Sequence, residues 1–407
     1  MNGSLPVRLL LLTGLLLSGG GTAGALETES LVRLQALSTR TSLPFTSDHQ
    51  DASAAVALGR TVLHARPGDG WKTGFNVFAR AEFYDQDPLA LQAAAALPVT
   101  TTPLSWRHED GEHHHDPDKK KRLSLVADQV WIERQGDLYS LKAGRLPVSL
   151  GNTFTFNPND FFMPFDPTGW YRDYRPGVDG IRLDISTGVV SELSVLRIFA
   201  RRRTGPDRYR RAAEWDATLL RFSTSLWEQG LTLLAGRLHD QEMAGLSLQM
   251  ALPLDLDFRF TGHQRRNRHD PDLVYREWAA GLSRQLTTDL SLAGEYYHNG
   301  AGADDPRDYL TRLLSGTTST TFPARTYASL SATMQWSPLW TGQALLLVNG
   351  TDDSCLVSLR HTRSLSDEAD AALVAFAPTC RKEDIRGMPP QYSLSPAGLQ
   401  LDYSVYF

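Results

Sequence analysis

The sequence predicts an all-β fold, an antiparallel up-and-down transmembrane barrel of about 16 strands, within a range of about 14–18. Three observations predict it. Strand-length segments in which apolar and polar residues alternate recur along the chain. Short and long links alternate between these segments, as they do when successive barrel strands emerge at opposite rims. The final segment also alternates, and it ends on an aromatic residue.

The alternating segments begin near residue 71. In Leu254–Phe260, every second residue is apolar, and Asp255, Asp257 and Arg259 occupy the other face. A barrel turns such an apolar face to lipid and its polar face to a wet lumen, whereas the alternative, a soluble exported β-sandwich, would bury the apolar face. We expect strands at 72–84, 122–134, 136–146, 177–186, 189–200, 213–226, 230–238, 243–251, 253–263, 273–285, 288–299, 325–336, 340–349, 353–363, 367–376 and 395–407.

The links favour the barrel over the sandwich. Links such as 135–136, 187–188 and 338–339 are tight, whereas 85–121, 147–176, 300–324 and 377–394 are long. In an antiparallel barrel, alternate links lie at the same rim, so the long links gather on one side and the tight turns on the other. Tryptophans near strand ends fit the aromatic girdles of such a barrel.

The C-terminal strand reads LQLDYSVYF, with Tyr403, Val405 and Phe407 on one face. An aromatic last residue that follows apolar residues at every second place resembles the recognition signal of bacterial outer-membrane β-barrels. The resemblance implies that the barrel-assembly machinery and outer-membrane lipid are partners of this chain.

The N-terminus has the pattern of a cleaved export signal over residues 1–25. Arg8 supplies the positive start, Leu9–Leu17 the apolar run, and Ala23–Ala25 an A-x-A cleavage site. Residues 26–70 are expected to form a periplasmic segment with room for an extra strand, and residues 71–407 the barrel. The expected location is the outer membrane of a Gram-negative bacterium, after cleavage near Ala25.

Composition narrows the function classes. Hydrophobic residues make up 41% of the chain and mean hydropathy is −0.30, which is too polar for a helical membrane protein. A net charge of −5 gives no indication of nucleic-acid binding.

The most unusual stretch is 143–184, which is dense in aromatic, proline and charged residues. Its AGR strand end, FNPNDFFMPFD loop and RPGVDGIRLD return strand resemble a family of porin-like outer-membrane barrels. Some members of that family form the barrel of porin–cytochrome electron conduits. The resemblance implies an outer-membrane barrel, and a conduit role would require a multihaem partner.

The loop at 150–176 is too apolar to project into water, so we expect it to fold inward and narrow the lumen. Charged and amide groups across the opening would then orient polar solutes. The alternative is a rim loop packed on itself. The candidate constriction residues are Asn157, Asn159, Asp160, Asp166, Arg172, Arg175, Asp179 and Arg182.

Two further groups of residues are candidate sites. Cys355 and Cys380 would lie near one rim, where an oxidising compartment allows a disulfide, with two free thiols as the alternative. His113, His114 and His115 are weak metal candidates because adjacent histidines in a hydrophilic loop lack a preformed geometry. The chain has no C-x-x-C motif, so we expect no cofactor.

The resulting functional hypothesis is a porin-like channel for passive passage of small hydrophilic solutes or ions. The sequence contains no G-x-S-x-G, H-E-x-x-H or phosphate-loop motif, so we do not expect an enzyme. One alternative is a structural sheath barrel of a larger electron-conduit or export complex. The protein partners considered for the chain are a second copy of itself, in a homo-oligomer, or a periplasmic protein. Another is a hydrolase carried on a barrel.

Overall fold

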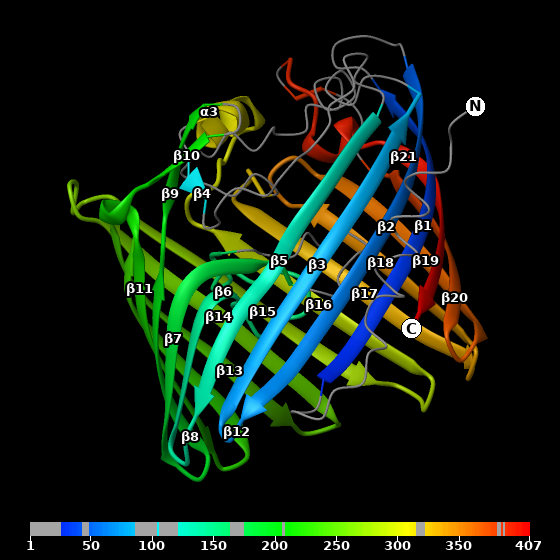
Figure 1. Cartoon of the computed structure of the whole chain (residues 1–407). Coiled ribbons are helices and arrows are strands. Elements are labelled where there is room, and N and C mark those ends of the chain that lie inside the picture. Colours follow the sequence, from blue (N-terminus) through cyan, green and yellow to red (C-terminus); the bar gives the residue numbers. More distant parts are fainter. Residues whose placement is uncertain are drawn as a thin grey trace.

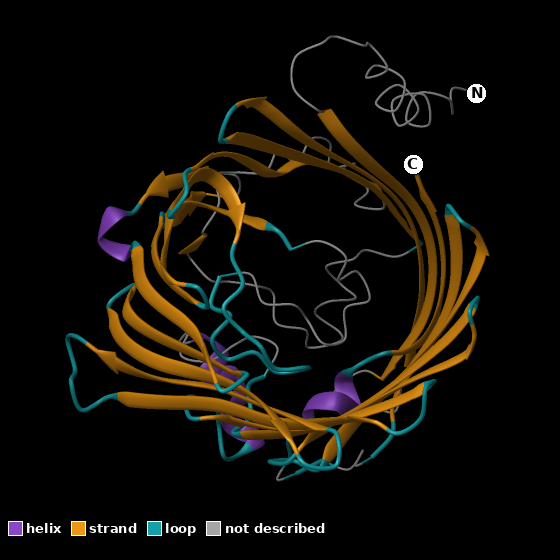
Figure 2. Cartoon of the chain, turned by 90° about the horizontal axis from the view of Figure 1, so that it is seen from below, coloured by secondary structure: helices purple, strands orange, loops and turns teal. Residues whose placement is uncertain are grey.

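The computed structural model describes residues 26–42, 49–85, 104–105, 121–162, 175–205, 208–314, 322–380, 384–385 and 387–407. In these residues, 18 strands form one closed antiparallel sheet (Figures 1 and 2). The ring closes where β21 (Ala397–Tyr406) pairs with β1 (Leu26–Ser42). The fold is therefore the up-and-down barrel that the sequence predicts.

Every segment expected to be a strand overlaps a strand of the wall, and β1 and β2 raise the number to 18. The other wall strands are β2 (His49–Gly68), β3 (Trp71–Tyr84), β5 (Lys121–Gln135), β6 (Tyr139–Pro147), β7 (Gly177–Gly188), β8 (Ser191–Ile198), β11 (Ala217–Leu226), β12 (Gln229–Leu238), β13 (Gln241–Leu252), β14 (Leu256–Asn267), β15 (Val274–Gln285), β16 (Leu290–Asn299), β17 (Thr326–Ser337), β18 (Trp340–Asn349), β19 (Ser354–Ser366) and β20 (Ala369–Pro378).

The expectation of a periplasmic segment at 26–70 is wrong for its described residues. β1 pairs with both β2 and β21, and β2 continues the wall to β3. The physical reason is that both faces of these strands carry apolar residues, which hides the period of two. On β1, Leu31 is buried inside whereas Leu34 is 51% exposed on the outside. The export signal expected at 1–25 lies outside the described residues.

The alternation of residues separates the two faces of the wall. On β21, Leu401 is 60% exposed, whereas its neighbour Asp402 is 5% exposed and contacts other interior side chains. On β14 and β17, Thr261 and Ser329 face inward and are buried, while Leu330 faces outward. An outer apolar face and an inner polar face are the arrangement of a barrel that spans a bilayer.

The two rims differ in their links. Tight turns join β2 to β3, β5 to β6, β7 to β8, β11 to β12, β13 to β14, β15 to β16, β17 to β18 and β19 to β20. The other rim has the long links, although β12–β13 and β18–β19 are short there as well. The start of β1 lies at the rim of tight turns, because β1 runs from there to its link with β2 at the other rim. The end of β21 lies at the same rim, because Tyr406 pairs with Leu31 near the start of β1.

Minor elements lie in the links. A small separate sheet contains β4 (Leu104–Ser105), β9 (Arg201–Gly205) and β10 (Arg208–Arg211), and Figure 1 places it at the rim of long links. Short helical turns are η1 (Ala213–Trp215), η2 (Pro306–Asp308), α3 (Tyr309–Leu314) and η3 (Gln391–Leu394). None of the helices in the described residues has the length and apolar character needed to cross a membrane.

The position of β1 in the wall can be tested with paired substitutions. We expect Leu34→Arg, on the lipid face, to lower the free energy of unfolding in lipid vesicles by up to about 2–4 kcal/mol. Gln35→Arg is the matched control, because Gln35 faces the lumen and its amide donates to Asp402 at 3.2 Å. Urea titration would measure both variants. Equal effects of the two substitutions would contradict the placement of β1.

Candidate functional site: a link folded into the lumen

The link between β6 and β7 crosses the interior of the barrel. Its described residues, 148–162 and 175–176, leave one side of the wall and contact β13, β14, β16 and β17, several strands away around the ring. Figure 2, which looks along the barrel, shows loop segments inside the ring of strands. Apolar side chains explain this path. Val148, Leu150 and Phe162 are buried in one cluster with Leu196 and Leu219 of the wall.

A carboxylate of the wall holds residues 154–156 of this link. Glu295, on β16 and 5% exposed, accepts hydrogen bonds from three successive backbone amides. The amides of Phe154 and Thr155 donate to its Oε2 at 2.9 and 3.0 Å, and that of Phe156 donates to Oε1 at 2.7 Å. Hydrogen bonds to an ionised acceptor are stronger than neutral ones, so Glu295 fixes the backbone of the link to the wall.

Aromatic packing supports the same contact. Phe156 is 1% exposed and lies between wall and loop side chains. Its ring centroid is 5.2 Å from that of Tyr297, 5.1 Å from Phe322 and 6.2 Å from Tyr327. Tilted and offset ring pairs at such distances add to the stabilisation from burial. Through this cluster the link contacts β16, β17 and Phe322.

Asn159 is directed at the wall rather than at an opening. Its Nδ2 donates to the carbonyl oxygen of Leu246 and to Oγ of Ser247, both at 3.3 Å. Its Oδ1 lies 3.1 Å from Nδ1 of His263, which makes that ring nitrogen the donor. The ring of Phe161 covers the same imidazole at 4.9 Å. Asn159 is fully buried and acts as a second attachment of the link.

Asp160 forms an ion pair with Arg175 within the link. Burial raises the pKa of Asp160 to about 6, although the Arg175 charge and the Leu150 amide oppose this rise. A raised folded pKa means that the proton stabilises the folded link. This contribution is fully present below the ordinary carboxyl pKa of 3.8 and is lost as the pH rises through about 6. The Arg175 carbonyl also accepts from Gln129 on β5 at 2.7 Å.

Local hydrogen bonds shape the tip of the link. The side-chain oxygen of Asn157 accepts from the amide and the hydroxyl of Thr153, at 3.0 and 2.9 Å. Asn157 thus closes a turn, as asparagine often does. Arg259 of β14 lies 4.5 Å from the centroid of the Phe154 ring and donates to the carbonyl of Asn152 at 3.2 Å.

The remaining sequence candidates fall into two groups. Asp179 and Arg182 lie on β7, where Asp179 accepts from Arg145 at 2.9 Å and Arg182 donates to Asp184 at 2.8 Å. The others, Asp166, Arg172, His113, His114 and His115, lie outside the described residues. The described residues contain no group of three or more His, Cys, Asp or Glu side chains that could hold a metal ion.

A second set of links packs inside the barrel around Asp352. Its Oδ2 accepts from the amide of Gln391 at 2.8 Å and from the hydroxyl of Tyr309 at 3.0 Å. Its Oδ1 accepts from the amide of Ser354 at 3.0 Å, and the Ser354 hydroxyl accepts from the amide of Tyr392 at 3.1 Å. Sequence reasoning missed this network, because single polar residues in three separate links carry no common pattern.

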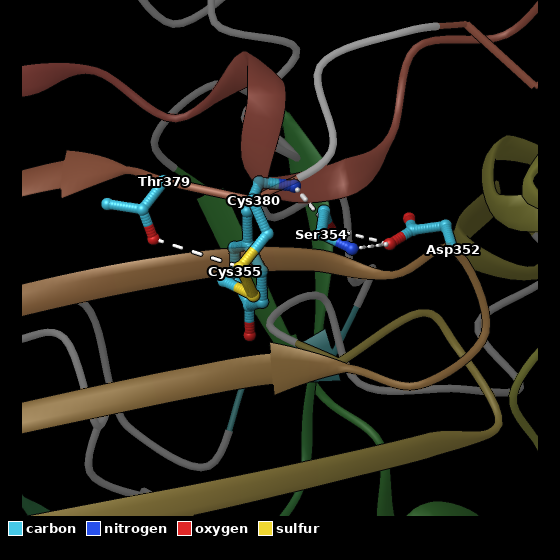
Figure 3. Close-up of a disulfide and its surroundings, with 6 residues drawn as sticks. Asp352, Ser354, Cys355, Thr379 and Cys380 are labelled. Atoms are coloured by element: carbon cyan, nitrogen blue, oxygen red, sulfur yellow. Dashed lines mark hydrogen bonds between the residues drawn. A yellow bond between two sulfur atoms is a disulfide. The ribbon is translucent and has the colours of Figure 1, made fainter.

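A disulfide secures the start of the last of these links. Cys355, in β19, and Cys380, just beyond β20, are bonded with Cα atoms 4.9 Å apart (Figure 3). The Thr379 amide donates to the Cys355 carbonyl at 3.1 Å, so the ladder of β19 and β20 continues up to the bridge. Figure 3 also shows Ser354 and Asp352 beside it, so the bridge adjoins the Asp352 network.

Ion pairs line the inner wall around these links. Arg60 of β2 pairs with Asp128 of β5 at 2.8 Å, and both side chains are about 5% exposed or less. Arg360 of β19 donates to Asp402 of β21 at 3.2 Å. Arg265, on β14, contacts Glu277 of β15, which in turn accepts from the Tyr297 hydroxyl at 3.2 Å. The polar inner face therefore carries both signs of charge.

Comparison with known proteins identifies the fold. No family model and no curated protein matches the sequence. The structure is similar to a BenF-like porin from Pseudomonas fluorescens Pf-5, with a TM-score of 0.60, 8% identity, and 94% of this chain and 98% of that chain covered. Pseudomonas aeruginosa OccK2 (OpdF), solved in complex with glucuronate, has a TM-score of 0.57 and 11% identity, with the same coverage. Acinetobacter baumannii OccAB4 also has a TM-score of 0.57, at 7% identity and with 94% and 98% covered. The chain thus has a porin fold, which confirms the porin-like architecture predicted from residues 143–184.

The anchoring role of Glu295 predicts a local change in dynamics. We expect Glu295→Gln to speed hydrogen exchange at the amides of Phe154, Thr155 and Phe156 by about tenfold or more, because charge-assisted hydrogen bonds contribute about 1.5–3 kcal/mol. Mass-spectrometric exchange on the folded barrel would measure it. Ser329→Ala is the control, since the Ser329 hydroxyl donates to the side chain of Thr155, at 3.1 Å, and not to a backbone amide. Unchanged exchange in Glu295→Gln would contradict the anchor.

The raised pKa of Asp160 predicts pH-dependent charge in the link. As the pH falls from about 7 to about 5, Asp160 takes up a proton and its negative charge beside Arg175 is lost. We expect the reversal potential in a salt gradient to shift toward anion preference over this range. Asp160→Asn should show the low-pH behaviour at both pH values. A wild-type shift that survives in Asp160→Asn would assign the effect to another group.

Proposed function

We propose that the protein is an outer-membrane channel through which small hydrophilic solutes or ions pass passively. The β6–β7 link is its constriction. No chemical step is involved, and discrimination arises from the width of the passage and from the charges beside it.

The observation that carries this proposal is the attachment of the β6–β7 link to the opposite side of the wall. A barrel of 18 strands is wide enough to leave an aqueous passage unless loops fill it. Here Glu295 and His263 hold residues 154–159 across that interior. A fixed obstruction inside a wide, polar-walled barrel narrows a passage without a moving lid.

The inner charges suit polar solutes. Asp160 and Arg175 on the link, and Arg259 on the wall beside Phe154, place both signs of charge near the obstruction. A polar solute that leaves water can form hydrogen bonds with these groups, so its loss of hydration costs little free energy. An apolar solute forms no such hydrogen bonds there. Among the similar structures, OccK2 holds glucuronate, a small polar anion, which is consistent with solutes of this class.

The outer-membrane location is also part of the proposal. It is supported by the lipid-compatible outer face, the porin fold, the alternating C-terminal strand β21, and the export pattern of residues 1–25. The tight-turn rim, where both ends of the wall lie, is then the periplasmic side.

Single-channel recording tests the proposal. Detergent-purified protein would be inserted in planar bilayers and compared with a variant in which residues 152–162 are replaced by a short Gly/Ser linker. We expect discrete conductance steps from the wild type and larger steps from the variant, because the anchored obstruction is removed.

Folding must be verified for each protein by heat-modifiable gel migration. Leu246→Ala, on the lipid face beside the attachment, is the matched control and should conduct like the wild type. Folded protein that conducts neither before nor after the replacement would refute the channel. Equal conductance of the two would refute the constriction and leave the channel.

A further inference from the structure

The tight turns carry exposed apolar side chains at their tips. Six of the eight tight turns hold, in or next to the turn, a large apolar residue that is more than half exposed. The turn collar, as we call it, consists of one such residue from each of the six turns: Leu138 (66%), Val189 (103%), Trp227 (92%), Leu254 (71%), Leu339 (57%) and Leu365 (51%). Turns that only reverse the chain in water are usually built from Gly, Asn, Asp and Ser.

Two of these residues also hold unfavourable backbone conformations. Trp227 and Leu254 have φ values of 48° and 66°, and the residues after them, Glu228 and Asp255, have 66° and 56°. The left-handed region costs a residue with a bulky side chain roughly 1–2 kcal/mol. At 92% and 71% exposure, the two side chains gain almost no packing within the chain that could offset this cost. A contact outside the chain would offset it.

The distribution of the turn collar indicates what makes that contact. Its residues lie in the turns of β5–β6, β7–β8, β11–β12, β13–β14, β17–β18 and β19–β20, and so are spread around most of the rim. A protein that binds at one side would meet only a few adjacent turns. A bilayer surrounds the whole barrel and meets all of them.

The turn collar is also continuous with the lipid-facing belt. Leu226, directly before Trp227, is 47% exposed on the outer face, and Tyr139, directly after Leu138, is 45% exposed. Three residues before Leu339, the outward Trp336 is 57% exposed. Tryptophan and tyrosine gather at the headgroup level of membranes, so the collar begins where the hydrocarbon belt ends.

Four of the six tips combine an apolar group with an acid. Asp137, Glu228 and Asp255 adjoin collar residues in sequence, and Asp367 lies two residues after Leu365. An acidic side chain stays in water, while a neighbouring leucine or tryptophan is stabilised at the boundary of headgroups and acyl chains. Such pairs match an interfacial depth and not the hydrocarbon centre.

We propose that the turn collar inserts into the interfacial zone of the periplasmic leaflet and sets the depth of the barrel in the membrane. The ligand is the phospholipid surface itself. The proposal requires the outer-membrane location given above but not conduction, so the recording experiment can fail while this inference stands.

Spin labelling tests the proposal. The only two cysteines of the chain are joined in the disulfide, so a new cysteine provides the one free thiol. Trp227→Cys, Leu254→Cys and the matched control Glu228→Cys would be nitroxide-labelled and reconstituted in vesicles of phosphatidylethanolamine with some phosphatidylglycerol. Collision rates with oxygen and with a water-soluble nickel chelate report depth.

We expect a ratio of oxygen to nickel collisions several-fold higher at 227 and 254 than at 228. Labels at 227 and 254 that meet nickel as freely as the label at 228 would overturn the proposal, and would point to a periplasmic protein or to no contact. If the cysteine variants do not fold, tryptophan fluorescence of the wild type and of Trp227→Leu tests the same proposal. The difference between their spectra is the emission of Trp227. We expect lipids brominated near the headgroup to quench this emission, and quenching by aqueous iodide alone would overturn the proposal.

Discussion

The requirement that every backbone polar group in a membrane be paired determines the rest of this structure. In hydrocarbon, an open sheet edge would leave a row of N–H and C=O groups without partners, so a sheet that spans a bilayer must close. Here the closure depends on β1 and β21. Their pairing ends where the backbones of Ser30 and Phe407 exchange two hydrogen bonds of 3.0 and 2.9 Å. Once the ring is closed, each strand has one face in lipid and one toward the interior.

A closed ring of 18 strands has more interior than its inward side chains fill, and the links occupy part of this space. The β6–β7 link needs cover for its aromatic residues and finds it inside. Burial alone would allow many positions, whereas the three amides directed at Glu295 select one. The Asp352 network performs the same task for the links around Tyr309 and Tyr392. A selective passage needs walls that stay in place, and buried, satisfied polar contacts provide them.

The two rims divide the remaining tasks. At the rim of long links, the disulfide of Cys355 and Cys380 holds the start of the β20–β21 link beside the Asp352 network. At the rim of tight turns, the chain places apolar side chains where turn chemistry alone would favour small polar residues. The first rim organises the interior, and the second faces the membrane boundary. The same wall thus serves passage and anchoring through different ends of its strands.

The sequence by itself determined the fold class, because a period of two with one apolar and one polar face has few stable architectures, and the alternating link lengths select the barrel among them. It also indicated the β6–β7 link as the inward segment, through its density of aromatic residues. It did not show β1 and β2, because inward leucines such as Leu31 and Leu58 make both faces of these strands apolar, so the alternation of apolar and polar residues is lost. Only the closed ring shows which of these leucines face inward. Nor did the sequence show Glu295 or His263, whose partners Phe156 and Asn159 lie 139 and 104 residues away. Only the tertiary structure decided these contacts, because the shear and closure of the barrel, and no local pattern, set which strands lie opposite a link that crosses it.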